Sequence, residues 1–197
     1  MRTDTGQVIN LADYRPTDFV LERVDLTFEL DPTETKVEAR LIFHRREGAD
    51  TTAPLVLDGD ELSLYSLLLD QNELPAEKYT VTPETLTIPD LPASVPFEIT
   101  VTTIINPEAN TQLMGLYRTG GIYCTQCEAE GFRRITYFPD RPDVLAVYTV
   151  NIIADKEANP LLLSNGNFLG GAGYGPGKHF AAWFDPHPKP SYLFALV

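Results

Sequence analysis

The residues with the most obvious chemical capacity lie in one short segment, Cys124-Thr125-Gln126-Cys127-Glu128-Ala129-Glu130. The spacing Cys124-x-x-Cys127 is typical of a redox pair or of half a zinc site. A thioredoxin-like pair belongs in an α/β fold, and the acidic residues that follow would raise the pKa of a thiolate-forming side chain. We therefore expect two reduced, partly buried thiols, with redox chemistry and metal binding as the alternatives.

The polar residues of the same segment indicate a different chemistry. Gln126, Glu128 and Glu130 alternate along the chain, so in an extended stretch their side chains would project to one side. An amide oxygen and a carboxylate can accept N–H bonds from a protonated amine, and such charge-assisted bonds are strong polar contacts. The pattern predicts an ammonium-binding site, with solvated surface carboxylates as the simpler interpretation.

Motifs of a complete catalytic centre are missing from the sequence. A zinc site with the cysteines would need more ligands, but His44, His179 and His187 are scattered singly. Neither His-Glu-x-x-His nor Gly-x-Ser-x-Gly occurs. The glycine-rich run 170–177 lacks the context of a phosphate loop and is expected to form a flexible hairpin tip. We predict no catalytic residue, no metal ligand and no cofactor in this chain.

The composition restricts the partners and the compartment. The chain has 197 residues, a formal net charge of -13 and a pI near 4.5, which argues against nucleic-acid binding. No apolar run is long enough for a membrane span, and residues 1–7 do not form a secretory signal. The chain contains only two cysteines, which suits a reducing compartment. We expect a cytoplasmic protein.

The pattern of apolar residues predicts an all-β fold, a single domain over residues 1–197. Alternation is cleanest in Val24–Leu30, and a turn at 31–35 leads into a second alternating run. Asn165-Gly166 is typical of a type I′ hairpin turn. The last run ends on apolar residues, which favours an excised piece of a longer protein. The expected strands are 24–30, 36–46, 55–57, 62–69, 79–82, 86–88, 97–105, 135–138, 147–153, 161–164, 179–184 and 192–197.

Two longer strings carry a family resemblance. They run from Met114 to Tyr117 and from Tyr123 to Val144, the second including Gly131-Phe132-Arg133-Arg134 and Asp140-Arg141-Pro142-Asp143. With weaker matches upstream from Asp13 and downstream to Val197, this sequence closely resembles the N-terminal domain of the zinc-dependent aminopeptidase N family, in its proteobacterial form.

The resemblance implies a saddle-shaped, mostly antiparallel, β-sandwich-like domain that packs in cis against a separate catalytic domain. In such a family the catalytic domain holds the zinc and the residues that hydrolyse the first peptide bond with a zinc-activated water. The N-terminal domain supplies a loop that holds the free α-amino group of a peptide substrate. By motif, that loop places Gln126 and Glu128 on the substrate, while Arg133, Arg134 and the 140–143 turn are expected to be structural.

A different class of function fits the same residues. The chain could be a stand-alone β-sandwich binding or interaction module without enzymatic activity, its acidic surface being incidental. The sequence that follows Val197 distinguishes the two hypotheses. A Gly-x-Met-Glu-Asn motif followed by His-Glu-x-x-His would establish the aminopeptidase.

Overall fold

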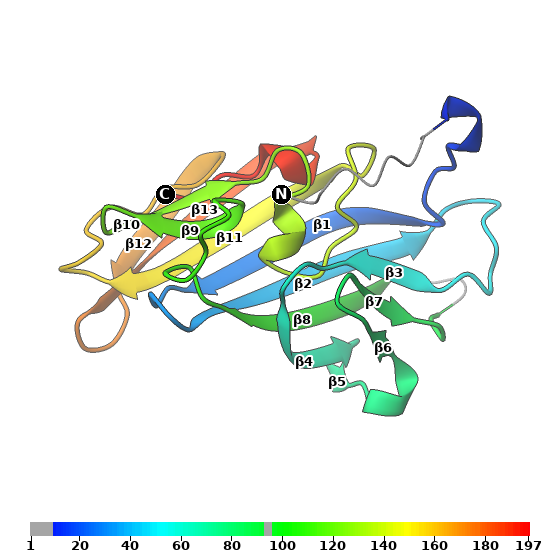
Figure 1. Cartoon of the computed structure of the whole chain (residues 1–197), viewed down its shortest axis with the longest axis horizontal. Helices are drawn as coiled ribbons and strands as arrows, with labels where there is room; N and C mark the ends of the chain where they lie inside the picture. The colour runs from blue at the N-terminus through cyan, green and yellow to red at the C-terminus, as the bar shows by residue number, and fades with distance from the viewer. Residues whose placement is uncertain (1–9, 93–95) are drawn as a thin grey trace.

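The computed structural model describes residues 10–92 and 96–197, so the prediction about a signal at residues 1–7 lies outside the described residues. Strands dominate, and the predicted all-β class is confirmed. The largest sheet contains β1 (Phe19–Glu29), β2 (Thr35–Arg45), β4 (Ser63–Leu69), β5 (Asn72–Glu73), β8 (Phe97–Ile105), β11 (Ala146–Asp155), β12 (Asn167–Gly173) and β13 (Lys178–Lys189). Their order is β12-β13-β11-β1-β2-β8-β4-β5 (Figure 1).

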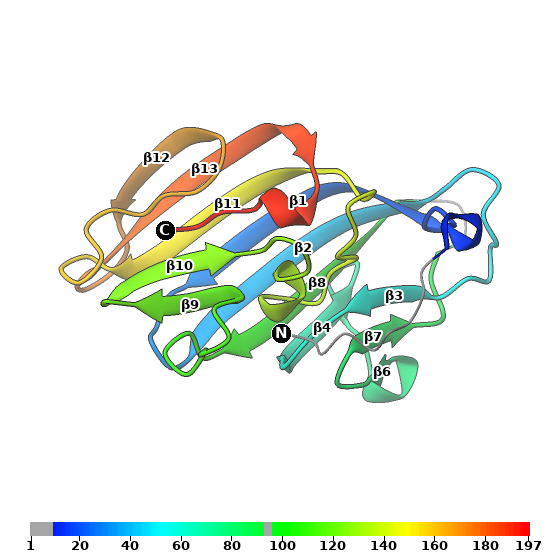
Figure 2. The same cartoon turned by 45° about the horizontal axis from the view of Figure 1, so that its top comes forward.

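Every neighbouring pair in this sheet is antiparallel except β1 and β11, which run parallel. Two small sheets complete the structure. One is the hairpin of β9 (Gly115–Thr119) and β10 (Ile122–Gln126), and the other holds β3 (Leu55–Asp58), β7 (Thr85–Ile88) and β6 (Thr80–Val81). Figure 2 shows the β9–β10 hairpin and the C-terminal segment side by side over one face of the large sheet.

Short 3-10 turns are the only helical elements of the described residues: η1 (Leu11–Asp13), η2 (Ala76–Lys78), η3 (Phe132–Arg134) and η4 (Ser191–Leu193). Among those residues we find no helix with the length and hydropathy that a bilayer crossing requires. Of the four turns, η3 and η4 matter most for the candidate site, because one follows its loop and the other begins the C-terminal segment.

The central strands follow directly from the alternation of apolar residues. On β1 the buried side chains are Val24, Leu26 and Phe28, as the sequence predicts, but the strand begins earlier, at Phe19. The register against β2 shifts between Leu21 and Arg23. A bulge of this kind inserts an extra residue and reverses the phase of the alternation, so the sequence pattern fails to reveal the first part of the strand.

Three of the predicted strands are wrong. Residues 135–138 follow η3, and only Phe138 makes an isolated bridge, to Asp58. Residues 161–164 and 192–197 contain no strand, and they meet around the isolated bridge between Ser164 and Leu196. Short apolar runs of this length are also what an irregular buried segment shows, because burial on all sides removes the alternation.

The hairpin predicted at Asn165-Gly166 is also wrong. Of these two residues only Gly166 has a positive φ, +87°, whereas a type I′ turn needs both. Asn165 instead uses its side chain, which accepts the N–H of Ala195 at 2.7 Å. The actual hairpin joins β12 and β13 through residues 174–177, so the predicted glycine-rich tip is shorter than run 170–177 and its first part is strand.

Candidate functional site

The predicted ammonium-binding residues lie where the β9–β10 hairpin ends. Gln126 is the last residue of β10 and pairs with Gly115 on β9. The chain then turns, so Glu128 and Glu130 stand on a turn and not on the extended stretch that the alternation predicted. Cys127 points inward and is 2% exposed. We call residues 126–131 the clamp loop.

The two residues predicted to bind an ammonium group are neighbours, but only one of them lines a pocket. Both side chains are exposed, and Gln126 Nε2 donates to the backbone oxygen of Glu128 at 3.1 Å. Glu128 lines an open pocket of about 480 Å³, whereas Gln126 lies outside the lining. The structure therefore places Gln126 beside Glu128 with its amide nitrogen engaged, which leaves the amide oxygen available to a ligand.

The pocket beside Glu128 is predominantly acidic. Its charged lining consists of Asp58, Asp60, Glu84, Glu128, Glu130, Arg133 and Arg134. Burial raises the pKa of Asp58, while the Arg133 guanidinium opposes that rise. With carboxylates outnumbering guanidinium groups, the pocket favours a cation over an anion.

Two glycines allow the clamp loop to pack tightly. A Cβ on Gly131 would overlap the backbone oxygen of Gln126 and lie 2.9 Å from Cα of Cys127. Gly115 has φ +73°, a conformation that L side chains rarely adopt. The N–H of Gly131 also donates to the oxygen of Cys127 at 2.8 Å, which closes the turn. The shape of the loop thus depends on small residues at both positions.

Arg133 and Asp140 fix the far end of the loop. The Arg133 backbone N–H donates to Asp140 Oδ2 at 3.1 Å, and its side-chain Nε donates to the same oxygen at 3.0 Å. Arg133 also lies 3.5 Å from a carboxylate oxygen of Glu130. The Asp140 side chain is buried at 1% exposure. The predicted structural role of this arginine is therefore consistent with its contacts.

Arg134 and the 140–143 turn are held by local ion pairs as well. Arg134 pairs with Asp60 at 2.8 Å and also with Glu61. Arg141 donates to Asp143 through two nitrogens, at 2.8 and 2.7 Å. This bidentate pair is the local pairing that the sequence predicted.

The cysteines are poorly placed for thiol chemistry. Both are free thiols, Cys124 partly buried and Cys127 buried. Burial raises the pKa of the Cys127 thiol, and the charge of Asp140 raises it further. Because the thiolate is the reactive and metal-binding form, a thiol that stays protonated serves neither role. For Cys127 the interpretation as a structural thiol is therefore the better supported one.

A metal site was tested against the donor groups of the described residues. There, no group of three or more His, Cys, Asp or Glu side chains is arranged to hold a metal ion. His44 lies on β2, while His179 and His187 lie on β13, and His179 Nε2 is 2.7 Å from the backbone oxygen of Asn159. The resemblance assigns the zinc to the separate catalytic domain, so no zinc is assigned to the residues of this chain.

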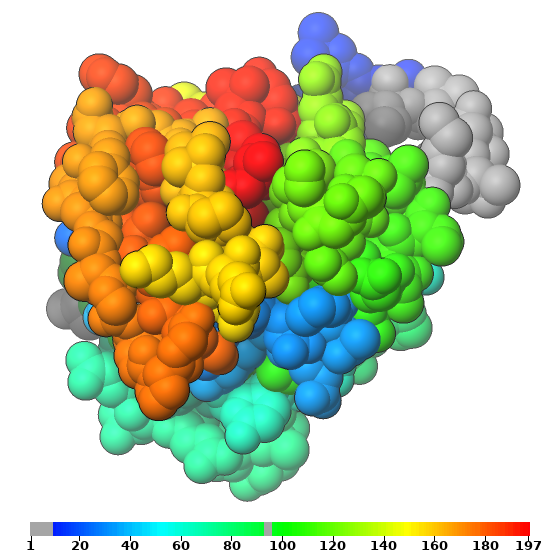
Figure 3. Space-filling model, turned by 90° about the vertical axis from the view of Figure 1, so that its left-hand side faces the viewer, coloured from blue at the N-terminus to red at the C-terminus, as the bar shows by residue number. Residues whose placement is uncertain are grey.

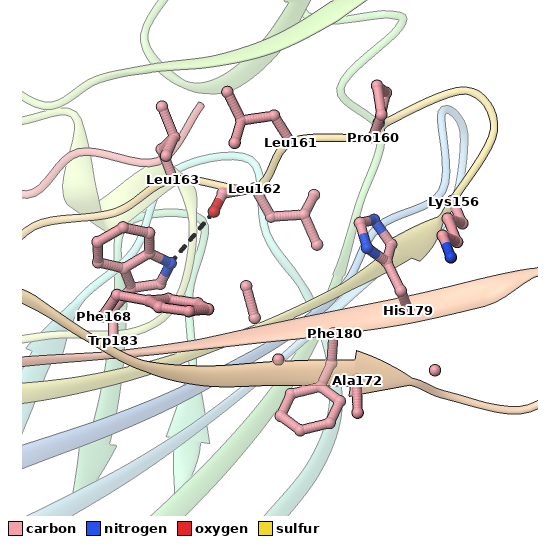
Figure 4. Close-up of a pocket in the computed structure, with 13 residues that line it drawn as sticks. Lys156, Pro160, Leu161, Leu162, Leu163, Phe168, Ala172, His179, Phe180 and Trp183 are labelled. Atoms are coloured by element: carbon pink, nitrogen blue, oxygen red, sulfur yellow. Dashed lines mark hydrogen bonds between the residues drawn. The ribbon is translucent and has the colours of Figure 1, made fainter.

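A second pocket, of about 550 Å³, lies between the loop after β11 and the β12–β13 hairpin. Figure 4 shows Leu161, Leu163, Phe168 and Trp183 around it, with Trp183 Nε1 donating to the oxygen of Leu162 at 3.2 Å. Its lining is mainly apolar, and it lies apart from the clamp loop. The sequence pattern does not predict this pocket, since its residues come from segments that alternation alone does not bring together.

A group of linked polar residues, of which Asp140 and Ser191 are buried and Asp58 is partly exposed, was likewise missed. Asp58, Asp140 and Ser191 come from distant parts of the sequence, yet the Ser191 hydroxyl donates to Asp140 at 2.5 Å and the Asp140 N–H donates to Asp58 at 3.0 Å. Only the position of Asp140 in a turn motif was visible, and nothing in the sequence indicates its partners.

Comparison with known proteins gives a consistent result. A family model described as the peptidase M1 N-terminal domain matches residues 20–193. Aminopeptidase N of Caulobacter vibrioides is 54% identical over 197 residues, which cover 100% of this chain and 22% of that relative. Aminopeptidase N of Escherichia coli is 47% identical over 185 residues, covering 94% of this chain and 21% of that relative.

Solved structures show the same relationship. The crystal structure of Legionella pneumophila aminopeptidase A in complex with aspartic acid matches with a TM-score of 0.89 and 41% identity, covering 94% of this chain and 22% of that one. An M1 zinc metallopeptidase from Deinococcus radiodurans matches with a TM-score of 0.76 at 16% identity, over 92% of this chain and 42% of that one, which is a likeness of fold alone. This chain spans about a fifth of the length of the curated relatives it matches.

Proposed function

The chain belongs to the peptidase M1 N-terminal domain family, and we propose that it is the substrate-gripping domain of a longer zinc-dependent aminopeptidase. In this proposal the chain is one β domain, and it binds the free α-amino group of a peptide while a catalytic domain in cis holds the zinc. The chain itself contributes no catalytic residue and no metal ligand. The aminopeptidases among its relatives support the activity assigned to the longer protein.

The observation that carries the proposal is the exposed carboxylate of Glu128 at the edge of an acidic pocket. A protonated amine has three N–H donors and needs acceptors without competing cations. Glu128 would accept one bond and the amide oxygen of Gln126 a second, since the Gln126 amide nitrogen already donates to the loop backbone. The acidic pocket would add a favourable potential for the ammonium group.

Such a clamp would set which peptide bond is cleaved. An amino terminus held at a fixed point places only the first carbonyl of the peptide within reach of a reactive centre, which is a positioning effect. The longer protein would then act as an exopeptidase. We also propose a cytoplasmic location, for which the two free cysteines are the supporting feature.

The test is a pair of substitutions in the full-length protein. Glu128→Ala removes the charged acceptor, and Gln126→Ala removes the neutral one. Losing a charge-assisted hydrogen bond to the substrate should raise KM for alanine p-nitroanilide about tenfold or more for Glu128→Ala, and less for Gln126→Ala. Glu77→Gln, an exposed carboxylate on η2, is the matched control and should leave KM unchanged.

The result is decisive in both directions. An unimpaired Glu128→Ala enzyme would overturn the clamp. The 197-residue chain alone should show no peptidase activity with or without added zinc, and activity at the level of the full-length protein would contradict the assignment of catalysis to another domain.

A further inference from the structure

The C-terminal segment runs beside the β9–β10 hairpin that leads into the clamp loop (Figure 2). Figure 3 shows its last residues, in red, reaching the surface between the green β9–β10 hairpin and the yellow loop after β11. The backbones of Leu163 and Val197 exchange two hydrogen bonds, of 2.8 and 3.0 Å. The segment is therefore held on one side by the loop after β11, and its other side faces the hairpin that carries Gln126.

The first contact with the hairpin is made by Thr125, immediately before Gln126. Its hydroxyl accepts the backbone N–H of Leu196 at 2.8 Å and donates to the oxygen of Leu196 at 3.2 Å. One side chain thus satisfies both backbone groups of one residue, a use that needs a hydroxyl because it both donates and accepts. This contact fastens the start of the clamp loop.

The second contact is aromatic and lies directly after the loop. Phe194 packs edge-on against Phe132, the first residue after the clamp loop, with ring centroids 5.2 Å apart at an angle of 81°. Both rings are buried, at 3% and 0% exposure. Edge-to-face packing of this kind favours one orientation over others, so the two segments keep a defined distance.

The third contact fastens the end of the loop through Asp140. The Ser191 hydroxyl donates to Asp140 Oδ1 at 2.5 Å, while Oδ2 accepts the backbone N–H and Nε of Arg133. One buried carboxylate thereby links the first residue of η4 with η3. The same short segment thus contacts both flanks of the clamp loop: Thr125 before it, and Phe132 and Asp140 after it.

We propose that the segment 191–196 is a brace that sets the position of the clamp loop, with Thr125 and Asp140 as positioning residues. In the proposed function, neither of these two residues touches the substrate. The effect of the brace on substrate binding rests on that proposed function. The brace holds Glu128 at a fixed point relative to the large sheet. A displacement of the segment would move Glu128 and weaken its grip without changing any residue of the clamp.

The deciding experiment uses the 197-residue chain and the hydroxyl of Thr125. Thr125→Val keeps the shape and removes both hydrogen bonds, whereas Thr125→Ser keeps the hydroxyl. Amide hydrogen exchange should rise about tenfold for residues 126–131 in Thr125→Val, and return close to wild type in Thr125→Ser. Thr119→Val, an exposed position on the same hairpin, is the control and should not change it.

Exchange of the β1 and β2 amides shows whether an effect is local. If exchange in residues 126–131 is unchanged in Thr125→Val, or rises only in step with the β1 and β2 amides, there is no brace. A rise confined to the loop that Thr125→Ser reverses supports it, and a second variant, Ser191→Ala, should loosen the end of the loop.

Kinetics of the full-length protein separate this proposal from the proposed function. Thr125→Val should raise KM for alanine p-nitroanilide several-fold with little change in kcat. If loop exchange rises but neither Thr125→Val nor Glu128→Ala affects KM, the brace stands and the ammonium clamp is wrong. If Glu128→Ala raises KM and Thr125→Val does not, the positioning role is overturned.

Discussion

Two regions of the molecule share one apolar core, but they differ in the polar contacts that hold their segments together. The central strands β1, β2 and β8 pack through alternating apolar side chains, as in the stacked rings of Phe43 and Phe97, 5.9 Å apart. The corner formed by residues 123–141 and 190–197 also buries rings such as Phe132 and Phe194, but its short segments are joined in addition by polar side chains such as Thr125 and Asp140. We call this second region the loop corner.

The two regions differ in how strongly their stabilising interactions depend on direction. Apolar burial is roughly proportional to area and has no preferred direction, so it stabilises the central strands without orienting any polar group. Hydrogen bonds have strict distances and angles, so the loop corner holds a few groups in defined places. The two regions should therefore respond differently to substitution, the first by losing global stability and the second by losing local geometry.

The largest effect is expected in the central strands. Phe43→Ala removes a ring that is 1% exposed, and the cavity left behind should lower the free energy of unfolding by about 4 kcal/mol. Urea unfolding of the 197-residue chain measures this loss. The folded fraction should keep the wild-type amide shifts of Gln126 and Glu128, because neither residue contacts the ring.

The control for Phe43→Ala is Tyr65→Ala. Tyr65 is another aromatic residue of the same sheet, but it is 70% exposed, and its loss should change the free energy of unfolding by less than about 0.5 kcal/mol. A change in the folded-state amide shifts of the clamp loop in Phe43→Ala would show that the two regions do not respond independently.

The second prediction concerns the buried carboxylate of the loop corner. Asp140→Asn removes the charge facing the Arg133 guanidinium, 3.0 Å away, and leaves a buried cation with a weaker partner. The cost should be about 2 to 3 kcal/mol in unfolding free energy. Unlike Phe43→Ala, the variant should also move the amide shifts of residues 126–133 in the folded state.

Asp143→Asn makes the same chemical change in the same turn, at a side chain that is 26% exposed. An exposed pair contributes about 1 kcal/mol or less. Equal losses of unfolding free energy for Asp140→Asn and Asp143→Asn would mean that burial does not distinguish the two carboxylates. The loop corner would then not be held more firmly than an exposed turn.

The third prediction tests the close packing of the clamp loop. A Cβ at Gly131 would overlap the Gln126 oxygen, so Gly131→Ala should cost about 1 to 2 kcal/mol as the loop shifts to make room. Hydrogen exchange of residues 126–131 should rise with it. Gly173→Ala is the control, since a Cβ there meets no atom within 4 Å.

If Gly131→Ala has no more effect than Gly173→Ala, the loop adapts freely. Its shape would then not be determined by packing, and the proposed brace would be holding a flexible segment.

The same contrast explains how far the sequence could predict the structure. The strand at 97–105 coincides with β8, and the second alternating run agrees with β2 to within a residue. In these strands each residue's side is set by its immediate neighbours, because a sheet has a period of two. The alternation of apolar and polar residues was therefore sufficient to predict the strands in which that alternation determines which side chains are buried.

The loop corner could be predicted only in part. Glu128 and Gln126 were found from their types and spacing, and the structure brings them together, although their role in binding stays a prediction. The partners of Thr125 and Asp140 lie 71 and 51 residues away in the sequence. No periodicity of the sequence links such distant residues, so the hydrogen bonds of the loop corner can be recognised only in the folded structure.

The smallest effect on stability is expected for the ion pair between Arg40 and Glu98 on the large sheet. Arg40 donates to Glu98 at 2.6 Å, and this hydrogen bond lowers the pKa of Glu98 below its ordinary value of 4.5. The unfolded chain then binds more protons than the folded one just below pH 4.5. The stabilisation is therefore present above pH 4.5 and is lost as the pH falls through the folded-state pKa.

Glu98→Gln removes this titration and leaves the shape. At pH 7 it should cost less than about 1 kcal/mol, because the Arg40 side chain is 45% exposed and solvent screens the pair. The difference from wild type should shrink at pH 3, as measured by urea unfolding at both pH values. A loss as large as that of Asp140→Asn would mean that polar ties stabilise equally wherever they lie, and that the loop corner owes its rigidity to something other than buried hydrogen bonds.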